Sequence, residues 1–79
     1  MIHVLFFGPV ADRVQMRETQ LTYNSGMKLQ DVIATLGVQH PSAFDIVSFT
    51  AVNQTQVKDM QLLLYDGDEI AFLAKFSGG

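Results

Sequence analysis

The sequence predicts a single α+β domain, in which a mixed β-sheet packs against one main helix, with short additional helices. Apolar residues recur at the helical spacing i, i+3, i+4, i+7 in one stretch, at Leu29, Val32, Ile33 and Leu36. Segments rich in Val, Ile and Phe lie before and after this stretch and are bounded by turn residues. Because 79 residues can build only one small core, one helix on one face of a sheet is the economical arrangement. We therefore expect residues 1–79 to form one domain.

The first third of the chain predicts a strand, a short helix and a second strand. Residues 2–7 are rich in Val, Ile and Phe and stop at Gly8-Pro9, as a strand does before a turn. Residues 9–14 have proline in the first turn, which favours a short helix. Residues 19–23 alternate polar and apolar side chains and are followed by a turn at 24–26, so a first hairpin-like pair is expected.

The main helix is expected to end at Gly37, because glycine suits the left-handed conformation that often terminates a helix. Lys28 is a poor cap for its N-terminus, so Asn24 or Ser25 is expected to do this work. Residues 41–47 can form another helical turn, although their mixed pattern decides little.

The last third predicts two short strands and a final strand. Residues 50–53 and 56–57 predict short strands that a tight turn joins. Residues 58–65 fit either a strand or a helical turn. Residues 66–68 predict a turn into a final strand at 69–73. This order of elements fits a β-grasp, or ubiquitin-like, sheet.

Alternation within the first and last strands places apolar residues on both faces of the sheet. The side chains expected on the core side are Ile2, Val4, Phe6, Ile70 and Phe72. Leu5, Phe7 and Leu73 then lie on the opposite face, where most small domains place polar groups. Exposed apolar residues are normal on any monomer, so this face is either ordinary surface or a docking patch for a partner.

The chain stops on Gly78-Gly79, soon after the final strand. Chain ends are often disordered and rich in small residues, which offers a plain explanation. Glycine lacks a Cβ, however, so a Gly-Gly terminus can pass a narrow channel and present its carboxylate from either side. Residues 74–79, fully extended at about 3.3–3.6 Å each, would reach roughly 20 Å from the domain. We interpret 74–79 as an extended, reactive C-terminal tail.

Composition excludes several functions. The absence of cysteine rules out disulfides, thiolate catalysis and iron–sulfur ligation, so any sulfur must come from another molecule. The net charge of −3, with the basic residues spread along the chain, disfavours nucleic acid as a partner. No apolar run approaches the length of a membrane span, and the N-terminus lacks the basic region of a signal peptide. We expect a complete, cytoplasmic chain with no membrane contact.

Other candidate residues point to weaker hypotheses. His3 and His40 stand apart, with no Cys and no helical spacing of His or carboxylates, so we expect no metal site. The acidic residues of 66–69 lack the other ligand positions of a calcium loop. Residues 53–55 are typical of a turn rather than of catalysis, and no Ser-His-Asp set or phosphate loop is present.

Four stretches that span nearly the whole chain are VLFF at 4–7 with the short helix after it, AVNQT at 51–55, DGDEIAF at 66–72, and the terminal Gly78-Gly79. In this order and spacing they resemble the sulfur-carrier proteins of the ubiquitin-like fold, and among these the small subunit of molybdopterin synthase. Members of that family often carry prolines before the tail, where this chain has Ala74-Lys75. The terminal carboxylate is not affected by this departure.

The resemblance implies a cycle of reactions at Gly79. A nucleotide-binding adenylyltransferase, related to ubiquitin-activating enzymes, would join the Gly79 carboxylate to AMP from ATP, and a sulfur donor would convert the adenylate to a thiocarboxylate. The large catalytic subunit of molybdopterin synthase would use this sulfur to convert cyclic pyranopterin monophosphate, in an expected heterotetramer. The chain would then be a non-catalytic subunit and cosubstrate that holds no cofactor stably.

Further residues receive roles in this interpretation. The tail residues expected to give access to a partner's pocket are Phe76, Ser77 and Gly78. The residues expected to bind the partner are Leu5, Phe7, Leu73 and Lys75.

Three other functions stay open from the sequence. The first is a sulfur carrier of thiamine synthesis; such carriers tend to be shorter and to lack the helix after the first strand, so residues 9–14 favour the molybdopterin branch. The second is a ubiquitin-like modifier that is attached through Gly79 to lysines of target proteins. The third is an interaction module whose glycines are inert.

Overall fold

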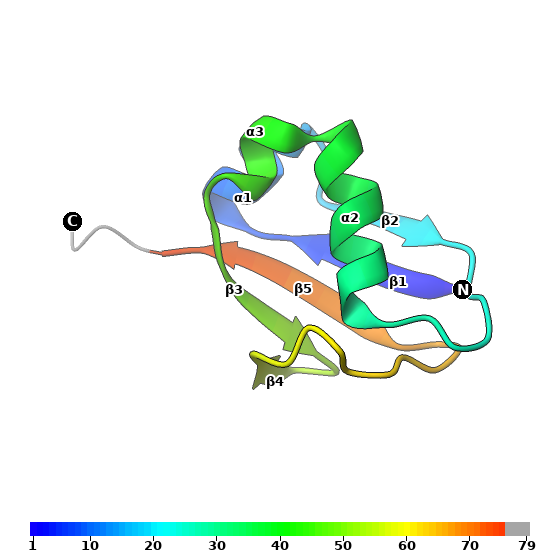
Figure 1. Ribbon diagram of the computed structural model, residues 1–79. Coiled ribbons are helices and arrows are strands. Elements are labelled where there is room, and N and C mark those ends of the chain that lie inside the picture. Colours follow the sequence, from blue (N-terminus) through cyan, green and yellow to red (C-terminus); the bar gives the residue numbers. More distant parts are fainter. Residues whose placement is uncertain (76–79) are drawn as a thin grey trace.

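The computed structural model describes residues 1–75, and residues 76–79, which contain the expected reactive end of the chain, lie outside the described part (Figure 1). Within residues 1–75 the chain forms one five-stranded sheet and three helices. The elements are β1 (Ile2–Phe6), α1 (Gly8–Val14), β2 (Glu18–Leu21), α2 (Leu29–Gln39), α3 (Pro41–Phe44), β3 (Val47–Val52), β4 (Thr55–Val57) and β5 (Glu69–Ala74). The expected α+β class is confirmed.

The sheet has the strand order β2-β1-β5-β3-β4, with the first and the last strand of the chain at its centre. β1 and β5 are parallel, whereas the pairs β1–β2, β3–β5 and β3–β4 are antiparallel. Figure 1 shows β1 and β5 side by side beneath α2, and the N-terminus lies at the opposite end of the sheet from the end of β5. The mixed β-grasp sheet expected from the order of elements is therefore present.

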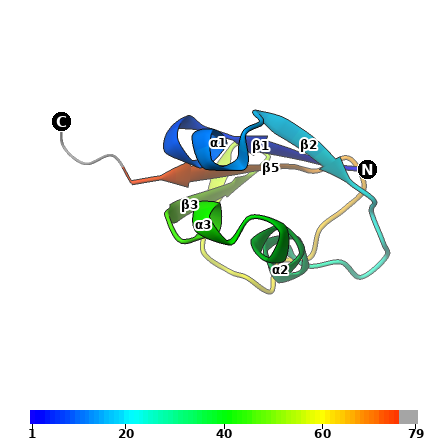
Figure 2. The same ribbon diagram turned by 90° about the horizontal axis from the view of Figure 1, so that it is seen from above.

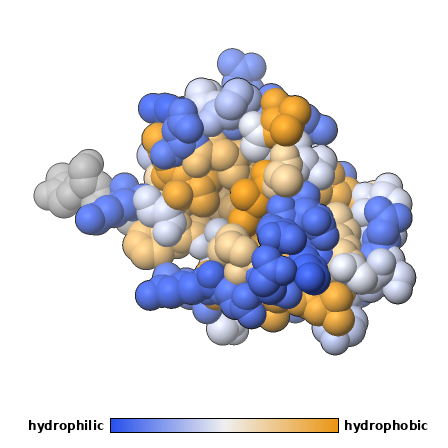
Figure 3. Space-filling view, viewed as in Figure 1, coloured by the Kyte–Doolittle hydropathy of each residue, from blue (hydrophilic) through white to orange (hydrophobic). Residues whose placement is uncertain are grey.

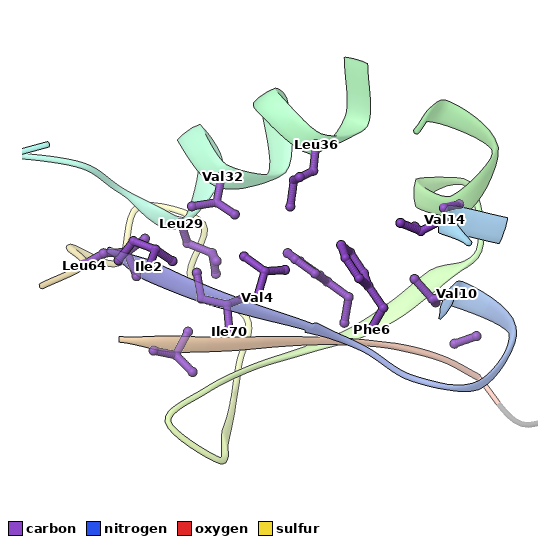
Figure 4. Packing of buried hydrophobic residues seen from close by; sticks show 14 residues of the cluster. Ile2, Val4, Phe6, Val10, Val14, Leu29, Val32, Leu36, Leu64 and Ile70 are labelled. Carbon is purple, nitrogen blue, oxygen red and sulfur yellow. The ribbon is translucent and has the colours of Figure 1, made fainter. Parts of the chain in front are cut away.

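The hydrophobic core lies between the sheet and α2, which crosses one face of it (Figure 2). Leu29, Val32 and Leu36 of α2 are buried and point toward the inward side chains of β1 (Figure 4). The buried strand residues on this side are Ile2, Val4, Phe6, Thr50, Val52, Ile70, Phe72 and Ala74. Full burial of a side chain of the size of Leu or Ile contributes about 1.5–3 kcal/mol, so each of these residues stabilises the packing of α2 on the sheet.

Aromatic contacts extend the core toward α3. The ring of Phe72 stacks on Phe6 with a centroid distance of 6.2 Å. The ring of Phe44, in α3, meets Phe72 edge-on at 4.9 Å. Such pairs add about 0.5–1.5 kcal/mol beyond the area that they bury, so α3 is tied to the central strand β5.

The expected end of the main helix at Gly37 is wrong, because α2 continues to Gln39. Gly37 has no positive φ and lies inside the last helical turn. The helix ends at His40, whose N–H donates to the Leu36 carbonyl at 2.8 Å. Pro41 follows directly, and the residue before a proline is disfavoured in the helical region, so the proline and not the glycine sets this boundary.

The expected N-terminal cap of α2 is also wrong. Lys28 is the N-cap residue, and its backbone N–H donates to the Asp31 carboxylate at 2.8 Å. Asp31 lies in the first turn, where a negative charge also interacts favourably with the helix dipole. Neither Asn24 nor Ser25 is the cap; the Asn24 carbonyl instead accepts the Met27 N–H at 3.0 Å.

β3 begins three residues earlier than expected, at Val47, and contains a register shift between Val47 and Phe49.

The segment 58–65 is neither a strand nor a helical turn: it runs beside the start of α2 with a single bridge between Leu63 and Lys28. Its Leu64 is fully buried, and the Leu64 N–H donates to the Met27 carbonyl at 2.8 Å.

The two turns at one end of the sheet are joined by side-chain hydrogen bonds. Asn53 and Gln54 have φ of 50° and 70°, as the tight β3–β4 hairpin requires. Asn53 donates to an Asp68 carboxylate oxygen at 3.0 Å, and its amide oxygen accepts the Glu69 N–H at 3.0 Å. The other Asp68 oxygen accepts the Tyr65 N–H at 2.9 Å. These polar groups thus hold the start of β5, and the expected turn at 53–55 is confirmed.

Candidate functional site

The sheet face that α2 leaves uncovered carries a row of apolar side chains across its central strands. Phe6 lies beside Phe72, and the Phe7 N–H donates to the Phe72 carbonyl at 3.2 Å, which places Phe7 next to Leu73. The β3–β5 register pairs Leu73 with Phe49. Phe7 and Phe49 are 47% and 40% exposed, whereas Leu73 is half-buried. Two aromatic rings therefore flank a leucine at the surface.

A second row lies one step further along the same face. Leu5 pairs with Ala71, and Ala71 with Ala51, so small and aliphatic side chains continue the surface. Glu18 of β2 and Gln56 of β4 stand at the two ends of this row. The apolar residues of these two rows are called the apolar face below. They are Leu5, Phe7, Phe49, Ala51, Ala71 and Leu73.

A third row is polar and lies at the other end of β5. His3 pairs with Gln20 on one side and with Glu69 on the other. The His3 Nδ1 atom lies 3.3 Å from the Gln20 amide nitrogen. Since β5 runs from Glu69 to Ala74, the apolar face lies at the end of the sheet where the chain leaves β5 toward its C-terminus.

Two hollows open on this side of the sheet near the apolar face. One of about 460 Å³ is lined by Leu5, Phe7, Ala11, Arg17 and Glu18, among other residues between β1, α1 and β2. The other, of about 350 Å³, lies over β3 and β4 and includes Phe49, Ala51 and Leu73. The apolar face is thus hollowed at both sides, which is the shape that takes protruding side chains of a protein partner.

The helix-covered side also exposes some apolar surface, as Figure 3 shows. A hollow of about 270 Å³ there is lined by Ile33, Phe44, Val47, Thr50 and Met60, among others. It lies beside β3 and the two helices α2 and α3, on the side away from the apolar face.

The structure brings together three of the residues that the sequence predicts for partner binding. Leu5, Phe7 and Leu73 share the apolar face, and Lys75 is exposed just after β5, although their role in binding stays a prediction. β5 includes Ala74, so the strand is one residue longer than expected. The tail residues Phe76, Ser77, Gly78 and Gly79 lie outside the described residues.

Sequence reasoning missed Phe49 and Ala51 as members of the apolar face. The sequence predicts a strand that begins only at Thr50 and allows a helical turn at 41–47, whereas β3 begins at Val47. Alternation provides the missing signal, because Phe49 and Ala51 are out of phase with the buried Thr50 and Val52. Extending the strand backwards by three residues would have placed the second aromatic ring on this face.

The remaining titratable candidates stay separate from one another. Among residues 1–75, no group of three or more Cys, His, Asp or Glu side chains lies close enough to hold a metal ion. The N-terminal ammonium of Met1 binds the Asp66 carboxylate and holds the pKa of Asp66 below its usual value, mainly through this hydrogen bond. Asp66 is exposed, and the pair lies at the polar end of the sheet.

Within the described residues no helix is both long and apolar enough for a membrane span.

The sheet order, the single crossing helix and the apolar face define a ubiquitin-like domain of the β-grasp type. A sequence model of the ThiS family matches residues 4–79. The chain therefore belongs to the ThiS family, and it is a ubiquitin-like sulfur carrier of this type.

Solved structures share this fold along nearly the whole chain. The small archaeal modifier protein SAMP1 from Haloferax volcanii has a TM-score of 0.83 at 18% identity, with 99% of this chain and 98% of that chain covered. A putative molybdopterin converting factor subunit 1 from Pyrococcus furiosus has a TM-score of 0.82 at 19% identity, with 95% and 97% covered. In a complex of subunits 1 and 2 of molybdopterin-converting factor from Helicobacter pylori 26695, one chain has a TM-score of 0.76 at 24% identity, with 99% and 97% covered.

Proposed function

We propose that this chain is the sulfur carrier of molybdopterin synthesis and the small subunit of molybdopterin synthase. The observation that carries the proposal is the apolar face beside the end of β5, because a carrier must be held by its partner at the point where its tail leaves the domain. The fold shared with a subunit 1 that is complexed with subunit 2 supports a large catalytic subunit as this partner. The assembly would be a heterotetramer in the cytoplasm.

The chemistry would take place at the Gly79 carboxylate. A carboxylate resists attack because its charge is delocalised and oxide is a poor leaving group. In an adenylyltransferase the carboxylate oxygen would attack the α-phosphorus of ATP and release pyrophosphate. A sulfur donor would then displace AMP from the acyl carbon and leave a thiocarboxylate, so one hard step becomes two easier ones. No cysteine of this chain is needed, in agreement with its composition.

The thiocarboxylate would next enter the large subunit and donate its sulfur to cyclic pyranopterin monophosphate. Glycine at 78 and 79 suits this entry, because no side chain crowds the channel or the reacting carbon. The helix α1 (Gly8–Val14) supports the molybdopterin branch, since carriers of thiamine synthesis tend to lack it.

The mass of the intact chain tests the proposed activation. After incubation with the adenylyltransferase of the same organism, ATP and a sulfur donor, we expect a mass gain equal to the exchange of one oxygen for sulfur. Omission of ATP should prevent the gain. Conjugates of the chain with lysines of other proteins, seen as larger bands on a blot, would instead favour a protein modifier. A chain that forms no adduct would contradict both the sulfur-carrier and the modifier hypothesis.

A further inference from the structure

One end of the apolar face carries charged side chains and the other does not. Asp12 of α1, Arg17 and Glu18 line the hollow of about 460 Å³, together with the apolar side chains of Leu5 and Phe7. All three charged residues are exposed. The hollow over β3 and β4 at the other side of the face is lined instead by apolar and uncharged polar residues, Gln54 and Gln56 among them.

Among residues 1–75 the one ion pair is that between Met1 and Asp66. The charged residues of this hollow therefore form no ion pair within the described part of the chain. Two carboxylates, Asp12 and Glu18, stand against one guanidinium, Arg17, which leaves an excess of negative charge. Glu18 also lines the neighbouring hollow of about 220 Å³ together with Glu69, so the acidic character continues along the sheet. The hollow therefore has an apolar floor and an acidic rim.

Such an asymmetry matters because apolar contact alone does not define an orientation. Burial of the apolar face would stabilise a complex in several rotations about the sheet normal, since the hydrophobic effect is non-directional. Charged groups at one side favour the rotation in which opposite charges meet and disfavour the others. A carrier needs one rotation, because its C-terminus must reach one reaction site.

We propose that the hollow between β1, α1 and β2 is an orienting socket for the large subunit of molybdopterin synthase, which inserts an apolar side chain with an adjacent Lys or Arg. This inference rests on the proposed function and specifies the chemistry of the partner surface. The apolar side chain contacts Leu5 and Phe7 on the floor, and the basic group meets Glu18 and Asp12 at the rim. The socket is continuous with the apolar face, so both are covered together.

Binding of the Glu18→Lys chain to the purified large subunit tests this proposal. Glu18 is exposed on the edge strand β2, where a lysine is well tolerated, so the variant is expected to fold. The control is the double variant Val38→Lys, Gln39→Lys, which changes the net charge equally at the exposed C-terminal turn of α2. Lysine is favourable at that position of a helix. Dissociation constants are measured at low and at high salt.

We expect the Kd of Glu18→Lys to rise on the order of tenfold at low salt, with a smaller difference at high salt, because salt screens charge pairs at an interface rim. The control variant should bind like the unmodified chain, and Asp12→Lys should weaken binding in the same way as Glu18→Lys. Equal affinities of Glu18→Lys and the control would overturn the socket while leaving the proposed function in place. Failure of the unmodified chain to bind the large subunit would contradict the proposed function itself, and the socket with it.

Discussion

Replacement of Gly79 by alanine is expected to lower sulfur transfer by about 10²-fold while the domain remains folded, because a methyl group beside the reacting carbon misplaces it within the partner's site. The adenylate and the thiocarboxylate both form at this carbon in the proposed cycle. The buried residues of the core between α2 and the sheet all lie between Ile2 and Ala74, and residue 79 is outside the described part of the chain. The effect should therefore appear in the rate and not in the thermal unfolding of the chain.

The matched control is Gly37→Ala, which makes the same chemical change inside α2. A Cβ at Gly37 meets no atom within 4 Å, and the backbone there is helical. Alanine at such a position stabilises a helix by about 0.5–1 kcal/mol relative to glycine. Gly37→Ala should transfer sulfur at the normal rate. Full sulfur transfer by Gly79→Ala would rule out the proposed reaction at the terminal carbon.

Replacement of Phe7 by aspartate is expected to weaken binding to the large subunit by about 2–4 kcal/mol, thirtyfold or more in Kd. The change removes an aromatic ring from the apolar face and places a charge there, next to Leu73, which a partner would have to bury. Isothermal titration or surface-based binding measurements give the Kd directly. Phe7→Leu should retain much of the affinity, because it keeps the apolar contact.

The fold should survive this substitution. Phe7 is 47% exposed and is the N-cap residue of α1, a position where aspartate is among the preferred residues. The control Val38→Asp changes an apolar residue that is 84% exposed on α2, away from the apolar face, and should bind normally. If Phe7→Asp and Val38→Asp bind the large subunit with equal affinity, the apolar face is not the docking surface.

Much of the fold follows from local patterns in the sequence. The helical spacing of Leu29, Val32 and Leu36 predicts α2, and these side chains are buried against the sheet. The alternation at 2–7 and 69–73 predicts the two central strands and assigns Leu5 and Leu73 to the face that α2 does not cover. Both signals are strong because one side of each element is buried. The apolar residues therefore recur at the spacing with which side chains return to the same side of a helix or a strand.

The errors occur where local patterns compete with tertiary structure. Glycine is common at the end of a helix, so Gly37 suggests a helix end locally. In the structure Pro41 determines where α2 ends. Leu64 belongs to an irregular segment whose backbone hydrogen bonds go to the start of α2, and no local pattern indicates such long-range partners. For the same reason Phe49 was missed, since its strand is interrupted by a register shift beside Ser48.

The site is predictable only in part. Leu5, Phe7 and Leu73 can be assigned to one face from alternation, but their meeting depends on the parallel pairing of β1 with β5, which joins segments at opposite ends of the chain. The charged hollow of Asp12, Arg17 and Glu18 depends on how α1 and the start of β2 are placed around the end of β1, and sequence spacing alone does not predict that geometry.

The most direct test of the central claim follows the sulfur itself. The chain with its thiocarboxylate is mixed with the purified large subunit and cyclic pyranopterin monophosphate, and the mass of the chain is measured as molybdopterin appears. We expect the chain to return to its carboxylate mass in step with molybdopterin formation, and the unactivated chain to yield none. A chain that keeps its sulfur in the presence of both the large subunit and the precursor would contradict the account.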